Sequence, residues 1–228
     1  MKTYPEPDEV ALMEKAASNL RDKLLIHLLF YSGCRISEVL ALAIEDIDFG
    51  HFTITIQHLK TSIKLSCIGC GQRLGRYHTF CPKCGIKIQK SRAEQQEHRR
   101  QRVLPVDSGM LSMIREYVGR GSLILRDGKM LMFRIRRHRA WQIVTECAKR
   151  AGLPKLVNPE TGKTHYISPH RLRDAFAVHA VKLDDSGDGL RLLQEHLGHH
   201  SFNTTARYRK ISGAEHQECY KRLWGKKD

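Results

Sequence analysis

The sequence predicts an α+β fold: a mainly helical domain with a small antiparallel sheet, into which a small cysteine-rich module is inserted. Apolar residues recur at helical spacing over most of the chain, as at Val10, Met13 and Ala17. Apolar residues alternate with threonines over residues 52–56, which indicates a half-buried strand. Between residues 66 and 89, Gly and Cys replace the large aliphatic residues that fill a core.

Three helices are expected in the first fifty residues. Asp8 is a suitable N-cap for the first, because its carboxylate can accept a hydrogen bond from the backbone of the first turn. The second covers roughly residues 22–31, which are rich in Leu and Ile, and ends at Gly33, a suitable left-handed C-cap. Ile36 then begins the third helix. This spacing places Arg35 at the start of a helix.

The cysteine-rich module interrupts the predicted sheet. One strand is expected at residues 52–56 and another at 102–106, on either side of residues 66–89. We interpret the segment between them as an insertion at the tip of a hairpin, where extra chain adds little loop-closure entropy. The highly charged run at residues 90–102 is expected to form a solvated helix or a flexible return segment.

The second half of the chain predicts more helices. Apolar faces at helical spacing, bounded by caps and stop signals, mark each of them. The clearest start is Ser168-Pro169, with Ser as N-cap and Pro at the first position, and the clearest stop is Gly198. Helices are expected at about residues 111–118, 140–151, 170–183, 190–197 and 214–224, with a short one that Asn203 caps and that holds Tyr208.

The net charge of +15 is unevenly distributed along the chain. Residues 1–50 carry 5 Lys/Arg against 9 Asp/Glu, a net of −4. Residues 51–110 carry 11 against 3, a net of +8, and residues 111–228 carry 23 against 12, a net of +11. This asymmetry favours a surface that binds double-stranded DNA, because Lys and Arg release counterions from phosphates. The alternative is a basic surface that is merely solvated.

Length and hydropathy limit the class of protein. The 228 residues can bury the core of one large domain, or of one domain with a small module. No apolar stretch is long enough to span a membrane, and the segment from Met1 to Pro7 is polar, unlike a signal peptide. We therefore expect a cytoplasmic protein with no membrane partner.

Four of the seven cysteines form two Cys-x-x-Cys-Gly motifs, Cys67 with Cys70 and Cys81 with Cys84. Each motif directs two thiolates to one point, and two such turns form a closed tetrahedral site that suits structural zinc. We predict a zinc ribbon that holds one zinc ion per chain. A pair of disulfides is the alternative, although the chain has no export signal, and His78 could replace one cysteine.

The module also carries basic residues that could contact DNA phosphates. The candidates are Arg73, Arg76, Lys83 and Lys87. An equally fair interpretation is that the module is a zinc-stapled spacer or a protein-contact surface.

Three blocks of sequence hold residues suited to phosphodiester chemistry. Guanidinium groups suit the charge that develops on the non-bridging oxygens, a nucleophile must attack, and the departing oxygen needs a proton. His and Arg three positions apart in the second block share one face of a helix. The blocks are Tyr31 to Leu40 with Arg35, His170-Arg171-Leu172-Arg173, and Leu197-Gly198-His199 followed nine residues later by Tyr208.

In order and spacing, these blocks resemble the Arg, His-x-x-Arg, Leu-Gly-His and Tyr motifs of the tyrosine recombinases of the phage integrase family. The resemblance covers nearly the whole chain outside the insertion, and four motifs in order are far more specific than any one of them. It implies that residues 1–228 form the catalytic domain of a site-specific recombinase. It also implies that Tyr208 attacks the scissile phosphate to form a 3′-phosphotyrosine, while Arg35 and Arg173 hold the non-bridging oxygens.

The resemblance implies further roles around this clamp. His170 and His199 complete it, with His170 as general base, and Lys60 at the end of the first strand protonates the leaving 5′-oxygen. Lys64 is an alternative to Lys60. Glu38 supports the first arginine. The reaction conserves the bond energy, so neither ATP nor a metal is expected at the active site.

Departures and alternatives remain open. Asp174 follows Arg173, where the family often has His or Ser/Thr, and this changes the hydrogen bonds around the site. The family's N-terminal DNA-clamping domain is expected to be absent from this chain, which would leave affinity and specificity poor. Each site residue also has a plain structural interpretation, such as pairing of Arg173 with Asp174 or burial of Tyr208. His196 and His200 crowd His199, so only the family register selects the catalytic histidine.

Two other functions compete with recombination. One is a zinc-ribbon DNA-binding or scaffold protein that has lost catalysis, which the complete set of motifs disfavours. The other is a type IB topoisomerase, which the integrase-like spacing disfavours. For assembly, the resemblance implies a tetramer on synaptic DNA, with the segment Ala214–Trp224 packed on a neighbouring subunit, and we expect a monomer in dilute solution.

Overall fold

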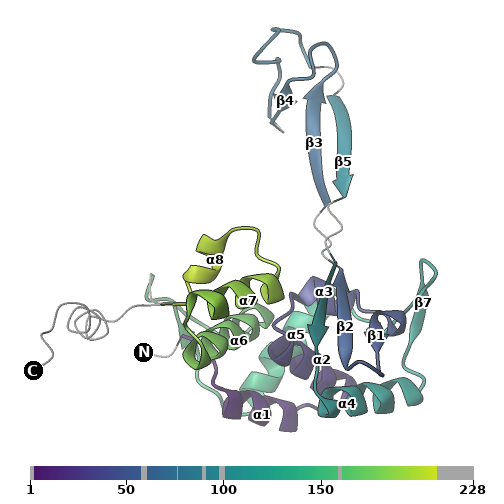
Figure 1. The fold of residues 1–228 in the computed structure, drawn as a ribbon, viewed down its shortest axis with the longest axis vertical. Coiled ribbons are helices and arrows are strands. Elements are labelled where there is room, and N and C mark those ends of the chain that lie inside the picture. The colour runs from purple at the N-terminus through teal and green to yellow at the C-terminus, as the bar shows by residue number, and fades with distance from the viewer. Residues whose placement is uncertain are drawn as a thin grey trace, which may run out of the picture. The chain divides into compact units, whose positions relative to one another are not determined.

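The computed structural model describes residues 3–57, 61–75, 77–88, 91–97, 101–158 and 161–209. The chain divides into two compact units (Figure 1). We call Met1–Ile56 together with Arg102–Asp228 the main unit, and Gln57–Gln101 the cysteine unit. Each is described by itself below.

The first helices of the main unit form where the apolar spacing predicts them. They are α1 (Pro7–Lys15), α2 (Leu20–Tyr31) and α3 (Ile36–Leu40). The expectation that Asp8 caps α1 is wrong, because Glu6 is the N-cap and Pro7 occupies the first turn, where no backbone donor is needed. Helix α2 begins two residues earlier than predicted, since the Asn19 side chain caps it by accepting a hydrogen bond from the backbone of Asp22 at 2.9 Å.

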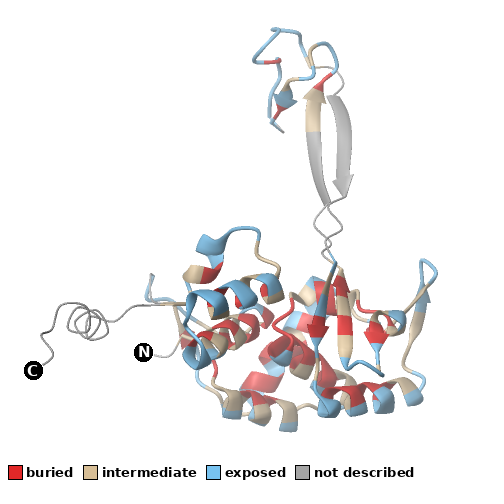
Figure 2. Ribbon diagram, in the orientation of Figure 1, coloured by how far each residue is buried: buried red, intermediate tan, exposed pale blue. Residues whose placement is uncertain are grey.

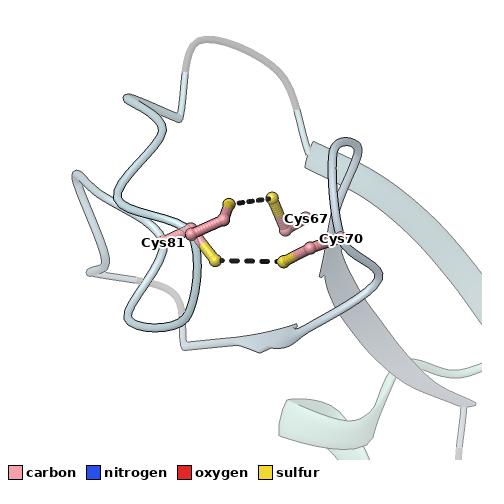
Figure 3. Close-up of side chains that lie close together, drawn as sticks. Cys67, Cys70 and Cys81 are labelled. Carbon is pink, nitrogen blue, oxygen red and sulfur yellow. Dashed lines mark hydrogen bonds between the residues drawn. The ribbon is translucent and has the colours of Figure 1, made fainter.

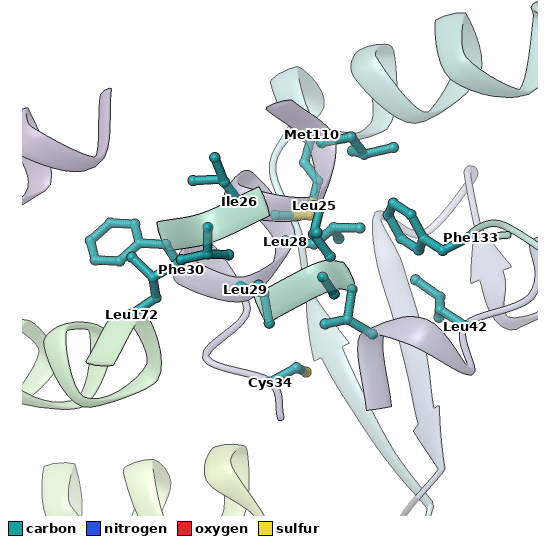
Figure 4. Packing of buried hydrophobic residues seen from close by; sticks show 14 of the residues in the cluster. Leu25, Ile26, Leu28, Leu29, Phe30, Cys34, Leu42, Met110, Phe133 and Leu172 are labelled. Atoms are coloured by element: carbon teal, nitrogen blue, oxygen red, sulfur yellow. The ribbon is translucent and has the colours of Figure 1, made fainter. Parts of the chain in front are cut away.

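Helix α2 lies at the centre of the main core. It packs against α1, α4 (Ser108–Gly119), α5 (Arg137–Arg150) and α6 (Pro169–Leu183). A helix with neighbours on most sides must be apolar over most of its circumference. The side chains of Leu24, Leu25, Ile26, Leu28 and Leu29 are accordingly 0% exposed. Figure 4 shows this part of the core, in which side chains of α2 lie near Met110 and Phe133.

The sheet of the main unit has the order β1-β2-β6. Its strands are β1 (Ile47–Asp48), β2 (Thr53–Gln57) and β6 (Gln101–Pro105), and the 3₁₀ helix η1 (Ile44–Asp46) leads into β1. Strand β1 runs antiparallel to β2, with Ile47 opposite Ile54. Ile54 and Ile56 are buried while Thr53 and Thr55, which alternate with them, are half-buried, in agreement with the predicted alternation (Figure 2).

The rest of the main unit is helical, apart from two small hairpins. The hairpins are β7 (Ile124–Arg126) with β8 (Lys129–Leu131), and β9 (Leu156–Val157) with β10 (Thr164–His165). Helices α6 and α7 (Gly187–Leu197) share a second, smaller cluster of buried residues. The last described helix is α8 (Phe202–Ala206), with Ser201 rather than the predicted Asn203 as its N-cap, so Tyr208 lies just beyond the helix.

The cysteine unit contains a sheet with the order β4-β3-β5. Its strands are β3 (Thr61–Cys67), β4 (Arg73–Leu74) and β5 (Ser91–Glu97). Strand β5 runs antiparallel to β3 over seven residue pairs. Neither expectation for residues 90–102, a solvated helix or a flexible return, was correct over β5, because pairing with β3 satisfies its backbone groups. Within the described residues, no helix is long and apolar enough to cross a membrane.

Candidate active site and metal centre

Arg35 projects from the N-terminus of α3, as the sequence predicts. It is the N-cap residue, and Gly33 before it has φ +57°, the left-handed region that glycine adopts most readily. A Cβ at Gly33 would also lie 2.5 Å from the ring of Phe176 on α6. The turn that delivers Arg35 therefore depends on glycine both for its backbone conformation and for close packing.

Glu38 holds Arg35 in place through two hydrogen bonds. Its carboxylate accepts hydrogen bonds from the backbone N–H and the Nη1 of Arg35, both at 2.9 Å. It is also 2.7 Å from Nη2 of Arg102 on β6. Burial alone would raise the pKa of Glu38, but the hydrogen bonds and charges of Arg102 and Arg35 outweigh it and lower the pKa to about 2.

Arg102 is a further residue beside this site, and no sequence motif indicates it. Its side chain is only 12% exposed, and its Nη2 also lies 3.7 Å from Sγ of the buried Cys34. Arg102 ends the charged run at residues 90–102, and such a run is typical of a segment exposed to solvent. The signal that could have found it is strand alternation, because Arg102 must share a face with Leu104, which is buried.

Arg173 is almost completely buried on α6, with 2% of its surface exposed. Its Nη1 donates to the carbonyl of Gly33 at 2.6 Å, and its Nη2 donates to the carbonyl of Leu197 at 2.7 Å. Burial and then the charge of Arg35 lower the pKa of Arg173 to about 10, so it stays protonated at neutral pH. Among the described residues it forms no ion pair, so the structural alternative of a pair with Asp174 does not hold.

His199 is held between Arg173 and Thr205. Its Nε2 is 3.1 Å from Nη2 of Arg173, and its Nδ1 is 2.9 Å from the hydroxyl of buried Thr205. Because a guanidinium can only donate, Nε2 must be the unprotonated nitrogen and Nδ1 must carry the hydrogen. Burial and then the charge of Arg173 lower the pKa of His199 to about 4. His199 is therefore neutral at pH 7.

The neighbouring histidines are placed differently. Nε2 of His196 is 3.0 Å from the carbonyl of Ser32, and its ring stacks on Phe176 with centroids 4.8 Å apart. His200 is exposed. Of the three crowded histidines, only His199 contacts Arg173 in the structure.

Tyr208 and His170 meet at one carboxylate oxygen. The Tyr208 hydroxyl donates to Oδ1 of Asp174 at 3.0 Å, and Nε2 of His170 lies 3.8 Å from the same oxygen. The Tyr208 ring is stacked on His199 with centroids 6.2 Å apart. Burial and then the negative charge of Asp174 raise the pKa of Tyr208 well above its usual value. The His170 side chain is 74% exposed.

These residues line one cleft of about 1400 Å³ in the main unit. Arg35, Arg173, His170, His199 and Tyr208 all contribute to its wall. Further basic residues line it as well, namely Arg137, Arg171, Lys182, Arg207 and Arg209. The cleft therefore suits an anion. Lys60, the predicted proton donor, lies outside the described residues.

The four cysteines of the cysteine unit form a candidate metal centre. Their Sγ atoms lie within 4.8 Å of one another, with Cys67 and Cys84 at 3.7 Å and Cys70 and Cys81 at 3.5 Å (Figure 3). A disulfide would require about 2.0 Å. Tetrahedral zinc, with Zn–S bonds of about 2.3 Å, separates its sulfur ligands by roughly 3.8 Å, so the site fits this ion.

The backbone explains why the two motifs converge. In each of them the N–H of the following glycine donates at 2.9 Å to the carbonyl of the first cysteine, from Gly71 to Cys67 and from Gly85 to Cys81. His78, the alternative ligand, is not part of this cluster, and its Nδ1 is 3.3 Å from the backbone N–H of Gly75. The basic candidates Arg73, Lys83 and Lys87 are exposed, whereas Arg76 lies outside the described residues.

Comparisons with known proteins find relatives among the tyrosine recombinases. The chain is 29% identical over 216 residues to tyrosine recombinase XerC of Roseiflexus sp. (strain RS-1), covering 90% of this chain and 52% of that protein. It is 27% identical over 214 residues to tyrosine recombinase XerA of Pyrococcus horikoshii, covering 90% of this chain and 55% of that protein. The chain thus spans about half the length of these curated relatives.

Solved structures share the fold. A crystal structure of XerA recombinase matches 99% of this chain and 65% of its own, with a TM-score of 0.63 and 20% identity. The catalytic domain of bacteriophage HP1 integrase matches 97% of this chain and 95% of its own, with a TM-score of 0.54 and 15% identity. Residues 5–215 of the 228 match the phage integrase family. The chain therefore belongs to the phage integrase family.

Proposed function

We propose that this chain cleaves and rejoins double-stranded DNA in site-specific recombination, through a 3′-phosphotyrosine on Tyr208. The observation that carries the proposal is the basic cleft, in which Arg35, Arg173, His199 and Tyr208 converge from distant parts of the sequence. Its chemistry suits a phosphodiester, because the arginines face the charge that grows on the phosphoryl oxygens as Tyr208 attacks.

Arg35 and Arg173 are the proposed oxyanion clamp. Arg35 is held by Glu38 and Arg173 by two carbonyls, so neither guanidinium needs to reorganise when DNA arrives. The charge of Arg35 destabilises the charged form of Arg173 in the free protein. A phosphate between them would relieve this repulsion, which supports anion binding at this point.

His199 is proposed to join the clamp once DNA is bound. In the free protein it is neutral, and its Nε2 accepts a hydrogen bond from Arg173. A phosphodiester would offset the positive charges that lower the pKa of His199, so the ring could take up a proton and donate to a phosphoryl oxygen. Thr205 keeps the ring in this orientation through Nδ1.

The remaining roles rest on the resemblance to tyrosine recombinases. His170, at the exposed mouth of the cleft, is proposed as general base, and Lys60 as the donor of a proton to the leaving 5′-oxygen. Glu38 is proposed to support Arg35, which its 2.9 Å hydrogen bonds favour. The chemistry is proposed to need no metal in the cleft.

We propose a zinc ribbon at residues 66–89, with one zinc ion held by Cys67, Cys70, Cys81 and Cys84. The separations between sulfur atoms support this ion. Zinc would act structurally here, because all four tetrahedral positions are taken by thiolates. The exposed Arg73, Lys83 and Lys87, together with Arg76, are proposed to contact DNA phosphates.

The proposed assembly is a monomer in dilute solution and a tetramer on synaptic DNA. The segment Ala214–Trp224, proposed to pack on a neighbouring subunit, lies outside the described residues. The experiment that tests the function is incubation with a nicked suicide duplex followed by a denaturing gel. A covalent protein–DNA adduct formed without added divalent metal supports the proposal, and its absence over a panel of family recombination sites contradicts it.

A further inference from the structure

The acceptor of the Tyr208 hydroxyl is Asp174, an acidic residue at a position where the family often has His, Ser or Thr. The contact is 3.0 Å long and uses Oδ1. Oδ2 of the same carboxylate accepts a hydrogen bond from Nη1 of Arg171 at 3.1 Å, and Nη2 of Arg171 lies 3.1 Å from Nε2 of His165. The Asp174 side chain is 13% exposed. The carboxylate is thus clamped on one oxygen and presents the other to the nucleophile.

We propose that Asp174 positions the Tyr208 hydroxyl and accepts its proton during strand cleavage. The inference rests on the proposed function, in which Tyr208 is the nucleophile, and it goes beyond it by assigning the direct proton contact to a residue outside the family motifs. Asp174 thereby becomes the first acceptor of the proton, in place of the general-base role that the resemblance gives to His170. His170 acts through Asp174, since its Nε2 lies 3.8 Å from the same Oδ1.

The nucleophile needs such an acceptor. Burial and the negative charge of Asp174 both favour the neutral phenol, so Tyr208 enters the reaction with its proton in place. A phenol becomes strongly acidic as its oxygen bonds to phosphorus, and a carboxylate already hydrogen-bonded to it can take the proton at that moment. Because Asp174 already contacts the hydroxyl, no free energy is needed to orient it before the reaction.

The proton and bond changes balance without an external reagent. The Oη–P bond forms, the proton of Oη passes to Oδ1 of Asp174, and the bond from phosphorus to the 5′-oxygen breaks. The leaving 5′-oxygen takes its proton from a separate donor, the role that the resemblance gives to Lys60. On rejoining, the 5′-hydroxyl attacks phosphorus and gives its proton back to that donor. The Oη–P bond breaks, and protonated Asp174 returns its proton to the Tyr208 oxygen.

Arg171 and His170 tune this carboxylate from the same helix. Arg171 binds Oδ2, so it directs Oδ1 towards Tyr208 instead of solvent. Nε2 of His170 lies 3.8 Å from Oδ1, on the exposed side of the carboxylate. Tyr208 and Arg207 lie just after α8, and the positive charge of Arg207 lowers the pKa of Tyr208.

Single-turnover cleavage of a suicide duplex by the full chain tests the proposal. Asp174→Asn keeps an acceptor oxygen but removes the basicity, so cleavage should slow by about 100-fold or more, within the range for general base catalysis. Asp174→Glu should recover part of the loss. Asp188→Asn is the matched control, because Asp188 is exposed in the first turn of α7 and makes the same charge change. It should cleave at the wild-type rate.

A substrate with sulfur in place of the 5′-bridging oxygen separates the two proton transfers, since a thiolate leaves without a proton. The loss in Asp174→Asn should persist on this substrate. If Asp174→Asn cleaves the sulfur substrate as fast as wild type does, Asp174 instead assists protonation of the leaving oxygen, and the proposal is overturned. Cleavage by Asp174→Asn or Asp174→Ala at the wild-type rate would also overturn the proposal. Cleavage faster than wild type would overturn it too, because the contact between Asp174 and Tyr208 would then inhibit the reaction.

NMR of the folded wild-type chain gives a second measurement that does not depend on an Asp174 variant. With ¹³Cζ-labelled tyrosine, the Tyr208 signal is the one missing from Tyr208→Phe, and it should titrate at higher pH than an ordinary tyrosine, whose pKa is about 10. Titration at the same or lower pH would mean that the contact with Asp174 is not made. If Tyr208→Phe still forms adducts, the proposed function fails, and not only this inference.

Discussion

Replacement of Arg102 by Met should destabilise the fold at neutral pH and remove much of its sensitivity to acid. Arg102 contributes two hydrogen bonds to the buried carboxylate of Glu38, at 2.7 and 3.3 Å. Methionine keeps much of the side-chain volume but leaves Glu38 with Arg35 as its basic partner. Loss of one partner from a buried ion pair destabilises by about 3–5 kcal/mol.

The pKa of Glu38 gives an independent magnitude. It falls from 4.5 to about 2 on folding, and at about 1.4 kcal/mol for each pH unit this corresponds to about 3 kcal/mol. Because the folded pKa is the lower one, this stability is fully present above about pH 4.5. It is lost as the pH falls from there through 2. Most of it depends on Arg102, whose hydrogen bond and charge lower the pKa more than those of Arg35 do.

The assay is urea unfolding of wild type and Arg102→Met at pH 7, 5 and 3. Wild type should be more stable by about 3 kcal/mol at pH 7 and 5, and the gap should narrow by about half or more at pH 3. Arg120→Met is the control, since its pair with Glu116 is exposed and should change stability by less than about 1 kcal/mol. A gap that is constant with pH, or no gap at all, would refute the assignment of Glu38 as a buried, ionised anchor.

Three other predictions concern the clamp, its turn and the metal centre. Arg35→Ala and Arg173→Ala should each slow cleavage about 100-fold or more in single-turnover assays, and near-normal rates would remove that arginine from the clamp. Gly33→Ala should lower both stability and cleavage, because its Cβ would lie 2.5 Å from Phe176, whereas unchanged thermal unfolding would contradict the packing described. Elemental analysis of protein purified without chelator should find one zinc per chain, and Cys67→Ser should lower this content; metal-free wild-type protein would exclude a zinc site.

Much of the fold follows from local pattern in the sequence. The Leu- and Ile-rich stretch at residues 22–31 predicted α2, and the Ile and Thr alternation predicted β2. Helix starts were less predictable, because capping depends on which of several polar residues adopts the cap geometry. Glu6 rather than Asp8 caps α1, and Ser201 rather than Asn203 caps α8. Strand β5 was missed because its polar sequence carries no alternation, and its pairing with β3 is a tertiary effect.

For the candidate site, the sequence predicted which residues take part but did not predict their charge states. The motifs predicted Arg35, Arg173, His199 and Tyr208 as site residues, and the structure brings all four to one cleft. Their charge states could not be predicted, because the low pKa of His199 and the raised pKa of Tyr208 arise from burial and from charges that only folding brings close. The ion pair of Arg102 with Glu38 likewise joins residues 64 positions apart in the sequence.

The most direct test of the central claim is covalent trapping with Tyr208→Phe. Wild-type protein and the variant are incubated with the same nicked suicide duplex, and the products are separated on a denaturing gel, with binding to intact duplex measured in parallel. The proposed mechanism predicts that wild type forms a protein–DNA adduct, whereas Tyr208→Phe forms none and still binds DNA with nearly unchanged affinity. An adduct formed by Tyr208→Phe would show that the nucleophile lies elsewhere and would contradict the mechanism.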